Sequence, residues 1–571
     1  MGKQIVRSGD VRLAVWTAGD PAHPTVVLVH GYPDTHVVWD EVVAVLAEDF
    51  HVVTFDNRGA GASDCPAGIE PYRIEQLAAD LLAVIDAVSP EQPVHLVGHD
   101  WGSILAWELV TDPAAADRIA SFTSVAGPCL DHVGHWMRGW AAHPRASAAQ
   151  LVRSWYVAAF QVPGLGTLPW RLGLGSAWDA LLARVDGVPR RERVRSRGAD
   201  GEIGVRLYRA NIARRLRHPG ERRTEVPVQV VHAAGDHFVG PDMGSDAHRW
   251  VPRLWRRTLA ATHWAPLTHG PALARMITEL VDHVRGAPAP ALTRTAREGE
   301  FGGKLVLVTG AGSGIGRATA HAFAQLGAEV VAVDVDAAAA AHTAGQVDGH
   351  AFAVDVSDEA AMRKLADEVV AAHGVPDVVV NNAGIGHSGT FLATTPDEWR
   401  RVLDVNLWGV IHGCREFGAR LVERGEGGHV VNVASAAAWL PATDLAAYST
   451  SKAAVAMLSD CLRGELAAHG IGVSTICPGL IDTNITRTST FSGLDDAAQD
   501  ARRAHAAAVY GRRNFRPEGV AREIVDAVRR SKAVVPVTPE ATVVRLLSRL
   551  SPGLLRTLAA SGLDRGAPVA R

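Results

Sequence analysis

The sequence predicts an α/β protein with two domains, each built on a parallel sheet that helices cover on both faces. Three observations lead to this prediction. The chain has 571 residues, which is more than one hydrophobic core normally organises. Short apolar runs alternate with helical patterns in both halves, as expected for parallel strands joined by crossover helices. In each half, a glycine-containing turn directly follows one of these runs.

The apolar runs define the expected strands and domains. We expect strands at 26–30, 52–56, 94–98, 228–232, 305–309, 330–334, 378–382, 430–434 and 473–477. The alternation of apolar runs and helical patterns is interrupted between about residues 131 and 226, where tryptophans mix with arginines. This predicts a helical cap inserted into the first domain. The domains are therefore expected at 1–285 and 303–540, joined by a semi-rigid linker at 286–302.

Residues 541–571 read as a basic amphipathic tail. Leucines alternate there with Arg545, Arg549 and Arg556, and Pro552 interrupts the pattern. Such a segment could pack on its own domain or make weak peripheral contact with a membrane surface.

Composition and charge exclude several classes of protein. An apolar fraction of 47% is typical of a globular chain, and a formal net charge of -4 gives no overall attraction to nucleic acid. The five cysteines are scattered and odd in number, so we expect neither a disulfide framework nor a metal site. No run reaches the roughly 18 apolar residues of a membrane span, and the first residues lack a signal pattern. A cytoplasmic location is expected.

The first candidate site is the turn at 98–102, which follows the predicted strand 94–98. Gly98 and Gly102 flank Asp100, and small flanking residues allow the strained strand-to-helix turn known as a nucleophile elbow. A carboxylate is ionised at neutral pH and needs no base to attack an electrophilic carbon. The backbone N–H groups of Tyr32 and Trp101 are expected to bind the oxyanion of the resulting ester.

Hydrolysis of that ester requires an activated water and therefore a histidine with an acid behind it. Asp236 and then His263 follow in the chain order nucleophile, acid, histidine. His232 and His269 are alternative bases, and the adjacent Trp264 favours His263.

These motifs, with His30-Gly31-Tyr32-Pro33 and the stretch 56–63, resemble the epoxide hydrolases of the α/β-hydrolase fold over about residues 11–284. The resemblance implies an α/β-hydrolase fold with a helical cap and two cap tyrosines, here Tyr156 and Tyr208. Their hydroxyls would protonate the leaving oxygen of an apolar epoxide. A haloalkane dehalogenase is the main alternative for this half, but that family typically has Asn at the position of Tyr32.

The second candidate site begins where the strand 305–309 enters the turn Gly310-Ala311-Gly312-Ser313-Gly314-Ile315-Gly316. Glycines let a pyrophosphate approach the backbone, and the following helix N-terminus favours its negative charge. Asp334 ends the next strand, where a carboxylate can accept both adenosine ribose hydroxyls and repel a 2'-phosphate. NAD is therefore favoured over NADP.

Tyr448 and Lys452 supply the acid/base chemistry of this half. They stand at i and i+4 on a predicted helix and share a face, so the cation can lower the pKa of the phenol. Ser435, thirteen positions before Tyr448, could polarise a substrate carbonyl or hydroxyl.

This half resembles the short-chain dehydrogenase/reductase family over about residues 303–532, through 309–316, 381–384, Ser435, Tyr448, Lys452 and 478–483. The resemblance implies a Rossmann-type doubly wound parallel sheet and pairing into a homo-oligomer through the helix bearing Tyr448. It also implies the roles of five further residues. Asn406 would complete a proton relay, and the cofactor would be contacted by Asp355, Val356, Asn382 and Thr483.

The two sites together predict a bifunctional enzyme that opens an epoxide to a vicinal diol and moves a hydride between NAD and a secondary alcohol or ketone. The alternative is that one half is a binding module without catalytic activity.

Overall fold

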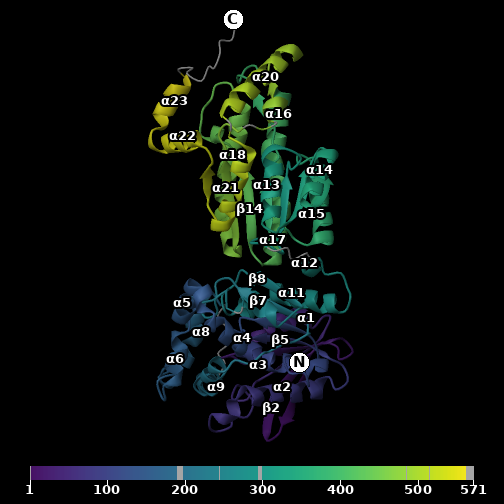
Figure 1. The fold of residues 1–571 in the computed structure, drawn as a ribbon, viewed down its shortest axis with the longest axis vertical. Coiled ribbons are helices and arrows are strands. Elements are labelled where there is room, and N and C mark those ends of the chain that lie inside the picture. The colour runs from purple at the N-terminus through teal and green to yellow at the C-terminus, as the bar shows by residue number, and fades with distance from the viewer. Residues whose placement is uncertain are drawn as a thin grey trace. The chain divides into compact units, whose positions relative to one another are not determined.

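The computed structural model describes residues 2–188, 197–243, 245–293, 299–481, 483, 485–513 and 515–560. These residues form two compact units, one up to Leu292 and one from Thr293 onward (Figure 1). Parts of three predicted segments lie outside the described residues: 189–196 in the cap, 294–298 in the linker and 561–571 in the tail.

The first unit contains an eight-stranded sheet in the order β1-β2-β4-β3-β5-β6-β7-β8. Its strands are β1 (Gly2–Ser8), β2 (Val11–Ala18), β3 (Thr25–Val29), β4 (His51–Phe55), β5 (Val94–His99), β6 (Ile119–Val125), β7 (Val228–Ala233) and β8 (Leu254–Leu259). The neighbours from β4 to β8 are parallel, as predicted. The edge strands β1 and β2 are antiparallel, which makes the sheet mixed. In β1 only Val6 is buried, so it lacks the continuous apolar run of central strands such as β3. The strands β2, β6 and β8 were not predicted either, because polar residues interrupt their apolar ones.

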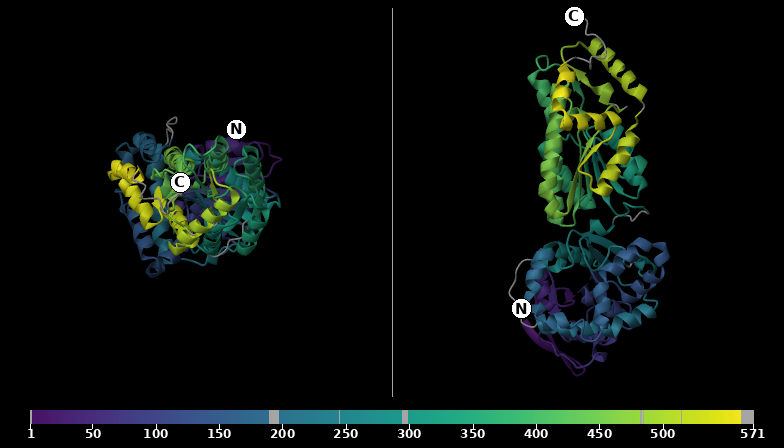
Figure 2. Two further views of the ribbon diagram at one scale, coloured as in Figure 1. Left: turned by 90° about the horizontal axis from the view of Figure 1, so that it is seen from above. Right: turned by 90° about the vertical axis from the view of Figure 1, so that its left-hand side faces the viewer.

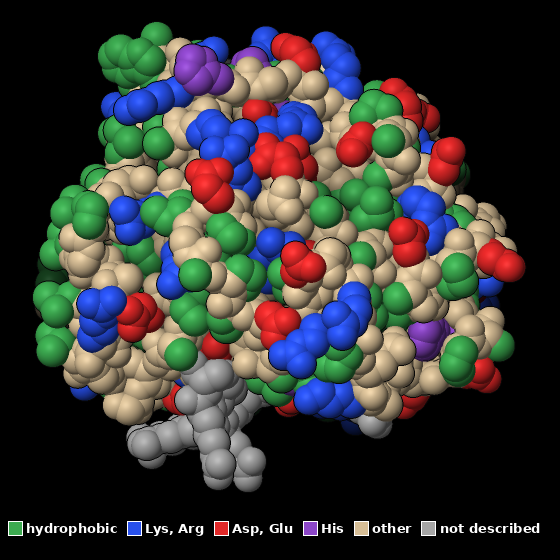
Figure 3. Space-filling model, turned by 90° about the horizontal axis from the view of Figure 1, so that it is seen from below, with side chains coloured by type: hydrophobic (Ala, Val, Ile, Leu, Met, Phe, Trp, Pro, Cys, Tyr) green, Lys and Arg blue, Asp and Glu red, His purple; other side chains and the backbone are tan. Residues whose placement is uncertain are grey.

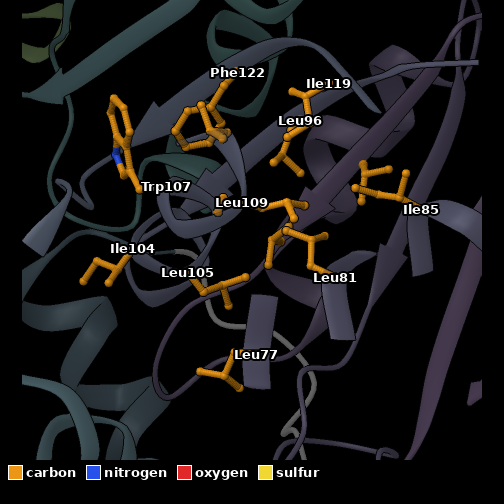
Figure 4. Close-up of a cluster of buried hydrophobic side chains, with 14 of the residues drawn as sticks. Leu77, Leu81, Ile85, Leu96, Ile104, Leu105, Trp107, Leu109, Ile119 and Phe122 are labelled. Carbon is orange, nitrogen blue, oxygen red and sulfur yellow. The ribbon is translucent and has the colours of Figure 1, made fainter. Parts of the chain in front are cut away.

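Helices cover both faces of this sheet and pack through two apolar clusters. One cluster joins α2 (Ile74–Val88) and α3 (Trp101–Val110) to the strands. Figure 4 shows it with Leu81 and Ile85 of α2 beside Leu96 of β5 and Leu109 of α3. The other joins α1 (Asp40–Leu46) and α11 (Gly270–Val284), with the short α10 (Ala265–Thr268) between β8 and α11. The sheet is thus the middle layer of three.

Six helices, here called the cap helices, lie between β6 and β7 in the described residues. They are α4 (Leu130–Arg138), α5 (Pro144–Arg153), α6 (Trp155–Gln161), α7 (Leu168–Arg171), α8 (Leu174–Val185) and α9 (Arg197–Arg217). Asn211 anchors α9, because its side chain accepts the N–H of Ile74 at 2.8 Å and donates to the carbonyl of Tyr72 at 2.9 Å. A cap residue therefore satisfies a backbone donor that the first turn of α2 leaves unpaired.

The second unit is a doubly wound sheet of seven parallel strands in the order β11-β10-β9-β12-β14-β15-β17. These are β9 (Leu305–Thr309), β10 (Glu329–Asp334), β11 (His350–Ala353), β12 (Val378–Asn381), β14 (Gly428–Val433), β15 (Ile471–Cys477) and β17 (Val534–Pro536). The strand order reverses between β9 and β12, and ligands of such sheets bind at this reversal, beyond the carboxyl ends of the strands. The short strands β13 (His387–Ser388) and β16 (Thr490–Phe491) pair separately.

Helices cover both faces of this sheet as well (Figure 2). One face carries α13 (Gly314–Gln325), α14 (Ala337–Val347) and α21 (Pro517–Arg530), and the other carries α15 (Glu359–His373), α17 (Gly409–Arg424) and α18 (Ala446–Leu466). The remaining helices are α12 (Pro290–Thr293), α16 (Pro396–Leu403), α19 (Ile485–Thr488), α20 (Asp496–Arg513), α22 (Pro539–Leu550) and α23 (Pro552–Ala560).

The first helix of the predicted tail, α22, packs on the second unit. Arg545 lies over the Trp439 ring at 5.7 Å and donates to the carbonyl of Val534 at 3.3 Å. Glu540 accepts the N–H of Leu480 at 3.2 Å.

None of the described helices combines the length and the apolar character that crossing a membrane requires. On the face in Figure 3, basic and acidic side chains lie side by side, without a field of one sign.

Candidate active sites

The elbow predicted around Asp100 is present between β5 and α3. Asp100 has φ 50° and ψ -123°, a backbone conformation that non-glycine residues adopt rarely and at a cost. The flanking glycines are required by space. A Cβ at Gly98 would lie 2.4 Å from Cα of Ser103, and one at Gly102 would lie 2.1 Å from the carbonyl oxygen of Val29. The turn therefore holds Asp100 at the carboxyl edge of the sheet.

The two backbone donors expected from sequence both bind the Asp100 carboxylate. The N–H of Tyr32 donates to Oδ2 at 2.8 Å, and that of Trp101 also hydrogen-bonds the side chain. Gly31 allows this approach, since a Cβ there would lie 2.5 Å from the same oxygen. Burial raises the pKa of Asp100 to about 6, against the opposing effects of His263 and the two N–H groups.

His263 lies between the two predicted carboxylates. Its Nε2 is 3.8 Å from Oδ1 of Asp100, and its Nδ1 is 2.9 Å from Oδ2 of Asp236. Asp236 is fixed in turn by the N–H groups of Phe238 at 2.7 Å and Val239 at 2.9 Å. Burial alone would lower the pKa of His263, but Asp236 and then Asp100 outweigh it and raise that pKa to about 9. Asp236 therefore orients the ring and favours its protonated form.

The two alternative histidines have other partners. His232 lies 3.1 Å from the guanidinium of Arg256, and burial lowers its pKa to about 4. His269 bonds the neighbouring Thr268 hydroxyl at 2.9 Å. The arrangement thus selects His263 as the histidine beside Asp100.

The cap brings Tyr156 from α6 and Tyr208 from α9 to the same place. Their ring centroids are 5.9 Å apart, with planes at 78°. Burial is the main cause of a raised pKa in both phenols, and the negative charge of Asp100 raises both further. Both hydroxyls therefore stay protonated at neutral pH, and both phenols lie close enough to Asp100 for its charge to act on them.

Tyr32 contacts both the elbow at Asp100 and the cap helix α9. Its N–H binds Asp100, while its hydroxyl donates to the carbonyl of Gly201 on α9 at 2.9 Å. Tyr32 lines a small pocket together with Trp101, Leu105 and Ile203 among others, and Asp100 is not one of its lining residues. The Asp100 side chain itself keeps 13% exposure.

Sequence reasoning missed Asp34, which is buried beside this site. One carboxylate oxygen lies 2.6 Å from Nη1 of Arg197 on α9, and the other accepts the indole N–H of Trp264 at 2.9 Å. Asp34 thereby ties a cap helix to the residue next to His263. The only signal in the sequence is its place directly after the motif ending at Pro33.

In the second unit, the turn after β9 has the shape that a dinucleotide requires. Gly310 and Gly314 have φ of 64° and 54°, and a Cβ at Gly316 would lie 2.1 Å from the carbonyl oxygen of Gly310. Ser313 is the N-cap of α13, and Ile315 packs into the core behind the turn. The N-terminus of this helix is therefore open to the backbone approach of a pyrophosphate.

The remaining predicted cofactor residues surround this turn or follow neighbouring strands. Asp334 accepts the N–H of Gly312 at 2.8 Å, and Asn382 donates to the carbonyl of Thr309 at 2.9 Å. Cβ of Thr483 would lie 3.3 Å from a Cβ on Gly314. Beyond β11, Asp355 accepts the N–H of Ser357 at 2.9 Å and Val356 is buried. The residues present fit a nicotinamide dinucleotide.

Tyr448 and Lys452 lie one turn apart on α18, as predicted. Lys452 is buried, donates to the carbonyl of Val433 at 3.0 Å and stands 5.9 Å from the centre of the Tyr448 ring. Burial lowers the pKa of Lys452 to about 8, with Cys477 acting weakly in the other direction. Ser435 receives the N–H of Ala437 and begins a short turn that packs against α18.

Asn406 is fully buried within a π-helical turn, Asp404–Trp408. Its side chain accepts the N–H of Ile385 at 2.8 Å and donates to the carbonyl of the same residue at 3.0 Å. A Cβ on Gly384 would lie 3.1 Å from Oδ1 of Asn406 and 3.4 Å from Nζ of Lys452. The two polar groups therefore face one small space, and π-helical turns often occur at functional sites.

Comparisons with known proteins agree with this division. The model of the family described as alpha/beta hydrolase fold matches residues 24–270, and that of the short chain dehydrogenase family matches 304–491. The chain is 45% identical over 581 residues to the probable oxidoreductase EphD of Mycobacterium tuberculosis, covering 97% of this chain and 98% of that protein. D-threitol dehydrogenase of Mycolicibacterium smegmatis is 39% identical over 188 residues, or 32% of this chain and 72% of that protein.

Two solved structures are similar to one unit each. A short chain dehydrogenase/reductase from Burkholderia phymatum in complex with NAD has 28% identity and a TM-score of 0.40, covering 48% of this chain and 99% of that one. A Bacillus megaterium epoxide hydrolase in complex with an inhibitor has 21% identity and a TM-score of 0.43, covering 49% and 100%.

A short chain dehydrogenase unit implies a nicotinamide cofactor, and both units imply small-molecule substrates. The mycobacterial relative matches both units in one continuous alignment. The chain therefore belongs to the family of the probable oxidoreductase EphD and joins an α/β-hydrolase-fold unit to a short chain dehydrogenase unit.

Proposed function

We propose that the first unit hydrolyses an apolar epoxide to a vicinal diol. The observation that carries this proposal is the placement of His263 between Asp100 and Asp236, beneath the cap phenols. In the first step, the Asp100 carboxylate attacks a ring carbon and the carbon–oxygen bond of the ring breaks. Tyr156 and Tyr208 together supply one proton to the departing oxygen, which would otherwise leave as an alkoxide.

The second step hydrolyses the ester on Asp100. His263 takes a proton from water, whose oxygen attacks the ester carbonyl, and the N–H groups of Tyr32 and Trp101 hold the oxyanion. The diol leaves, the Asp100 carboxylate is restored and the proton returns to the phenol pair. Esterification removes the negative charge of Asp100, which is one of the causes of the raised pKa of His263. The first step therefore lowers the pKa of His263, so that more of the ring is neutral at pH 7 and can accept a proton from water in the second step.

Two features support an epoxide over a halogenated substrate. The hydroxyl of Tyr32 is engaged by Gly201, so this side chain offers no donor to a halide. The cap phenols supply a proton, which an alkoxide leaving group requires and a halide does not.

The test is to trap the ester. The full chain with Asp236→Asn is mixed with styrene oxide, denatured and digested, and the peptide containing Asp100 is measured by mass spectrometry. We expect a mass increase equal to one epoxide on that peptide. Lack of the adduct on Asp100, while the unsubstituted chain turns over the epoxide, would rule out this mechanism. Lack of turnover altogether would favour a first unit that only binds.

We propose that the second unit moves a hydride between NAD and a secondary alcohol or ketone. When bound, a nicotinamide cofactor would supply the hydride chemistry. Tyr448 exchanges the proton of the substrate hydroxyl, and Ser435 binds the same oxygen. Lys452 lowers the pKa of the phenol, and Asn406, facing the same space as Lys452, passes the proton toward solvent through water.

The preference for NAD over NADP rests on Asp334, which is followed by Val335 rather than a cation. A carboxylate repels a 2'-phosphate, and valine cannot pair with one. We expect NAD to bind the full chain at least about tenfold more tightly than NADP. Asp334→Ser should reduce this ratio, and calorimetric titration of both dinucleotides measures it. Equal affinities in the unsubstituted chain would contradict the assignment.

We also propose that the diol, or a related alcohol, is the substrate of the second unit, and that the chain pairs through α18. The covalent linkage motivates the first idea, and the exposed Met457 on α18 supports the second. NADH production from styrene oxide, dependent on Asp100, tests the first idea. Light scattering of the chain and of Met457→Glu tests the second, with a monomer expected for the variant.

A further inference from the structure

One cluster of metal-binding side chains lies outside both sites. Within the described residues, Glu329, His350 and His373 each offer one ligand atom, and these atoms all lie within 4.8 Å of one another. We propose that the cluster binds a divalent transition metal such as Zn²⁺. The sequence analysis judged metal binding from the cysteines and expected no site. This cluster contains no cysteine, and its two histidines and one carboxylate come from three separate elements.

The distances suit one small cation. His350 Nε2 is 2.7 Å from Oε1 of Glu329, and His373 Nδ1 is 3.7 Å from the same oxygen. Zinc bonds of about 2.0–2.1 Å at tetrahedral angles place neighbouring ligand atoms about 3.3 Å apart. These two separations bracket this value, and the two imidazole nitrogens lie within 4.8 Å of each other, so side-chain adjustments of about an ångström would bring all three atoms onto one ion.

The donor types select the class of metal. Two imidazoles and one carboxylate favour Zn²⁺, Co²⁺ or Ni²⁺, whereas Mg²⁺ and Ca²⁺ prefer oxygen ligands alone. The side chains of Glu329 and His373 are 15% and 17% exposed, while that of His350 is 37% exposed. The cluster is thus partly buried and partly exposed to solvent, which leaves room for water as the fourth ligand.

The charges also favour a cation. The imidazole rings of His350 and His373 stack with their centroids 3.8 Å apart, and the carboxylate of Glu329 supplies a negative charge beside them. Among the described residues, the ion pairs of Glu329 are those with these two histidines.

The location indicates a structural role. Glu329 begins β10, His350 begins β11 and His373 ends α15, whereas Asp334 lies at the other end of β10. Five residues of strand span about 17 Å, so the cluster is separate from the cofactor turn. A bound ion would tie the edge strand β11, which leads to Asp355 and Val356, to β10 and α15.

The experiment uses the full chain stripped with a chelator and then dialysed. Titration calorimetry with ZnCl₂ is expected to give one site per chain, and Zn²⁺ should raise the melting temperature of the dehydrogenase unit by about 5 °C. Co²⁺ should give the strong visible absorption of tetrahedral coordination. His350→Gln and His373→Gln should each weaken binding by about 10- to 100-fold.

His321→Gln provides the matched control, because His321 belongs to the same unit and bonds Gln346 away from the cluster. It should bind Zn²⁺ like the unsubstituted chain. Circular dichroism of the metal-free proteins checks that every variant is folded. The proposal fails if the unsubstituted chain binds no Zn²⁺, or if folded cluster variants bind it as tightly as the control does.

Discussion

The two units bury a basic side chain in opposite electrostatic surroundings. His263 faces the carboxylates of Asp236 and Asp100, and its pKa is raised to about 9 although burial alone would lower it. Lys452 donates to the carbonyl of Val433, and burial lowers its pKa to about 8. Neighbouring charge therefore decides the direction of the shift. The first site holds a compensated ion pair, and the second holds a cation whose charge can act on Tyr448.

The largest expected effects separate the two sites. Asp100→Asn should reduce epoxide hydrolysis by at least about 10³-fold, because the amide is a poor nucleophile. Tyr448→Phe should reduce dehydrogenase activity similarly, since the proton donor is lost. Each variant should leave the other activity unchanged, which diol formation and NADH absorbance measure in parallel. A loss of both activities in either variant would show that the units do not act as independent sites.

Asp236→Asn tests the ion pair itself. The amide would favour the wrong tautomer of His263 and would remove the negative charge that stabilises the protonated ring, so ester hydrolysis should slow by about 10²- to 10³-fold. Ester formation needs no base and should be less affected. Rapid-quench measurement should therefore show a burst in which one equivalent of epoxide is consumed per site, followed by slow release of the diol. Equal slowing of both steps would mean that Asp236 serves mainly to shape the site.

Lys452→Met tests the uncompensated cation. Without the ammonium group the pKa of Tyr448 should rise, and alcohol oxidation at pH 7 should fall about 10²-fold, with partial recovery at higher pH. Lys452→Arg should not restore the activity, because the guanidinium is larger and planar. Rate against pH for the three proteins provides the measurement. An unshifted profile for Lys452→Met would leave Lys452 as a binding residue only.

The pH dependence of the first half-reaction should reflect Asp100. Its pKa is raised to about 6, so the carboxylate is protonated, and unable to attack, below that pH. Single-turnover ester formation should be about tenfold slower at pH 5 than at pH 7. If the rate of ester formation instead fell only near pH 4, the carboxylate would be better solvated than its burial implies.

Asp34→Asn should have the smallest effect, about fivefold on kcat/KM for the epoxide. The amide keeps the shape of Asp34 but loses the charge that pairs with Arg197 and receives the Trp264 indole. Asp112→Asn, an exposed substitution in the same unit, is the control. A fall in stability with unchanged kinetics would make Asp34 a purely structural residue.

The local parts of both sites could be predicted from the sequence. The elbow at Asp100 and the turn from Gly310 to Gly316 are each encoded by glycines at fixed spacing, and most central strands have an apolar run of their own. The central strand β6 was missed, because Ser121, Thr123 and Ser124 interrupt its apolar residues. Partners far apart in the chain could not be predicted in this way. Asp34 meets Arg197 across 163 positions, and no local pattern reports such a contact.

Strands at the sheet edges were also missed, for a different physical reason. β1 is largely exposed, and β11 alternates between exposed and half-buried positions, so neither has the continuous apolar run of a central strand. β17 has only three residues. The π-helical turn around Asn406 likewise has no sequence signature, because it depends on how the loop at Ile385 packs against it.

The packing of α22 links the end of the chain to the cofactor region of the second unit. A Cβ on Gly479 would lie 2.2 Å from the hydroxyl of Thr538, and Glu540 binds the N–H of Leu480, three residues before Thr483. Loop and helix should therefore open together on the timescale of amide hydrogen exchange. Dinucleotide binding should slow deuterium uptake not only around Leu480 but also within 539–550.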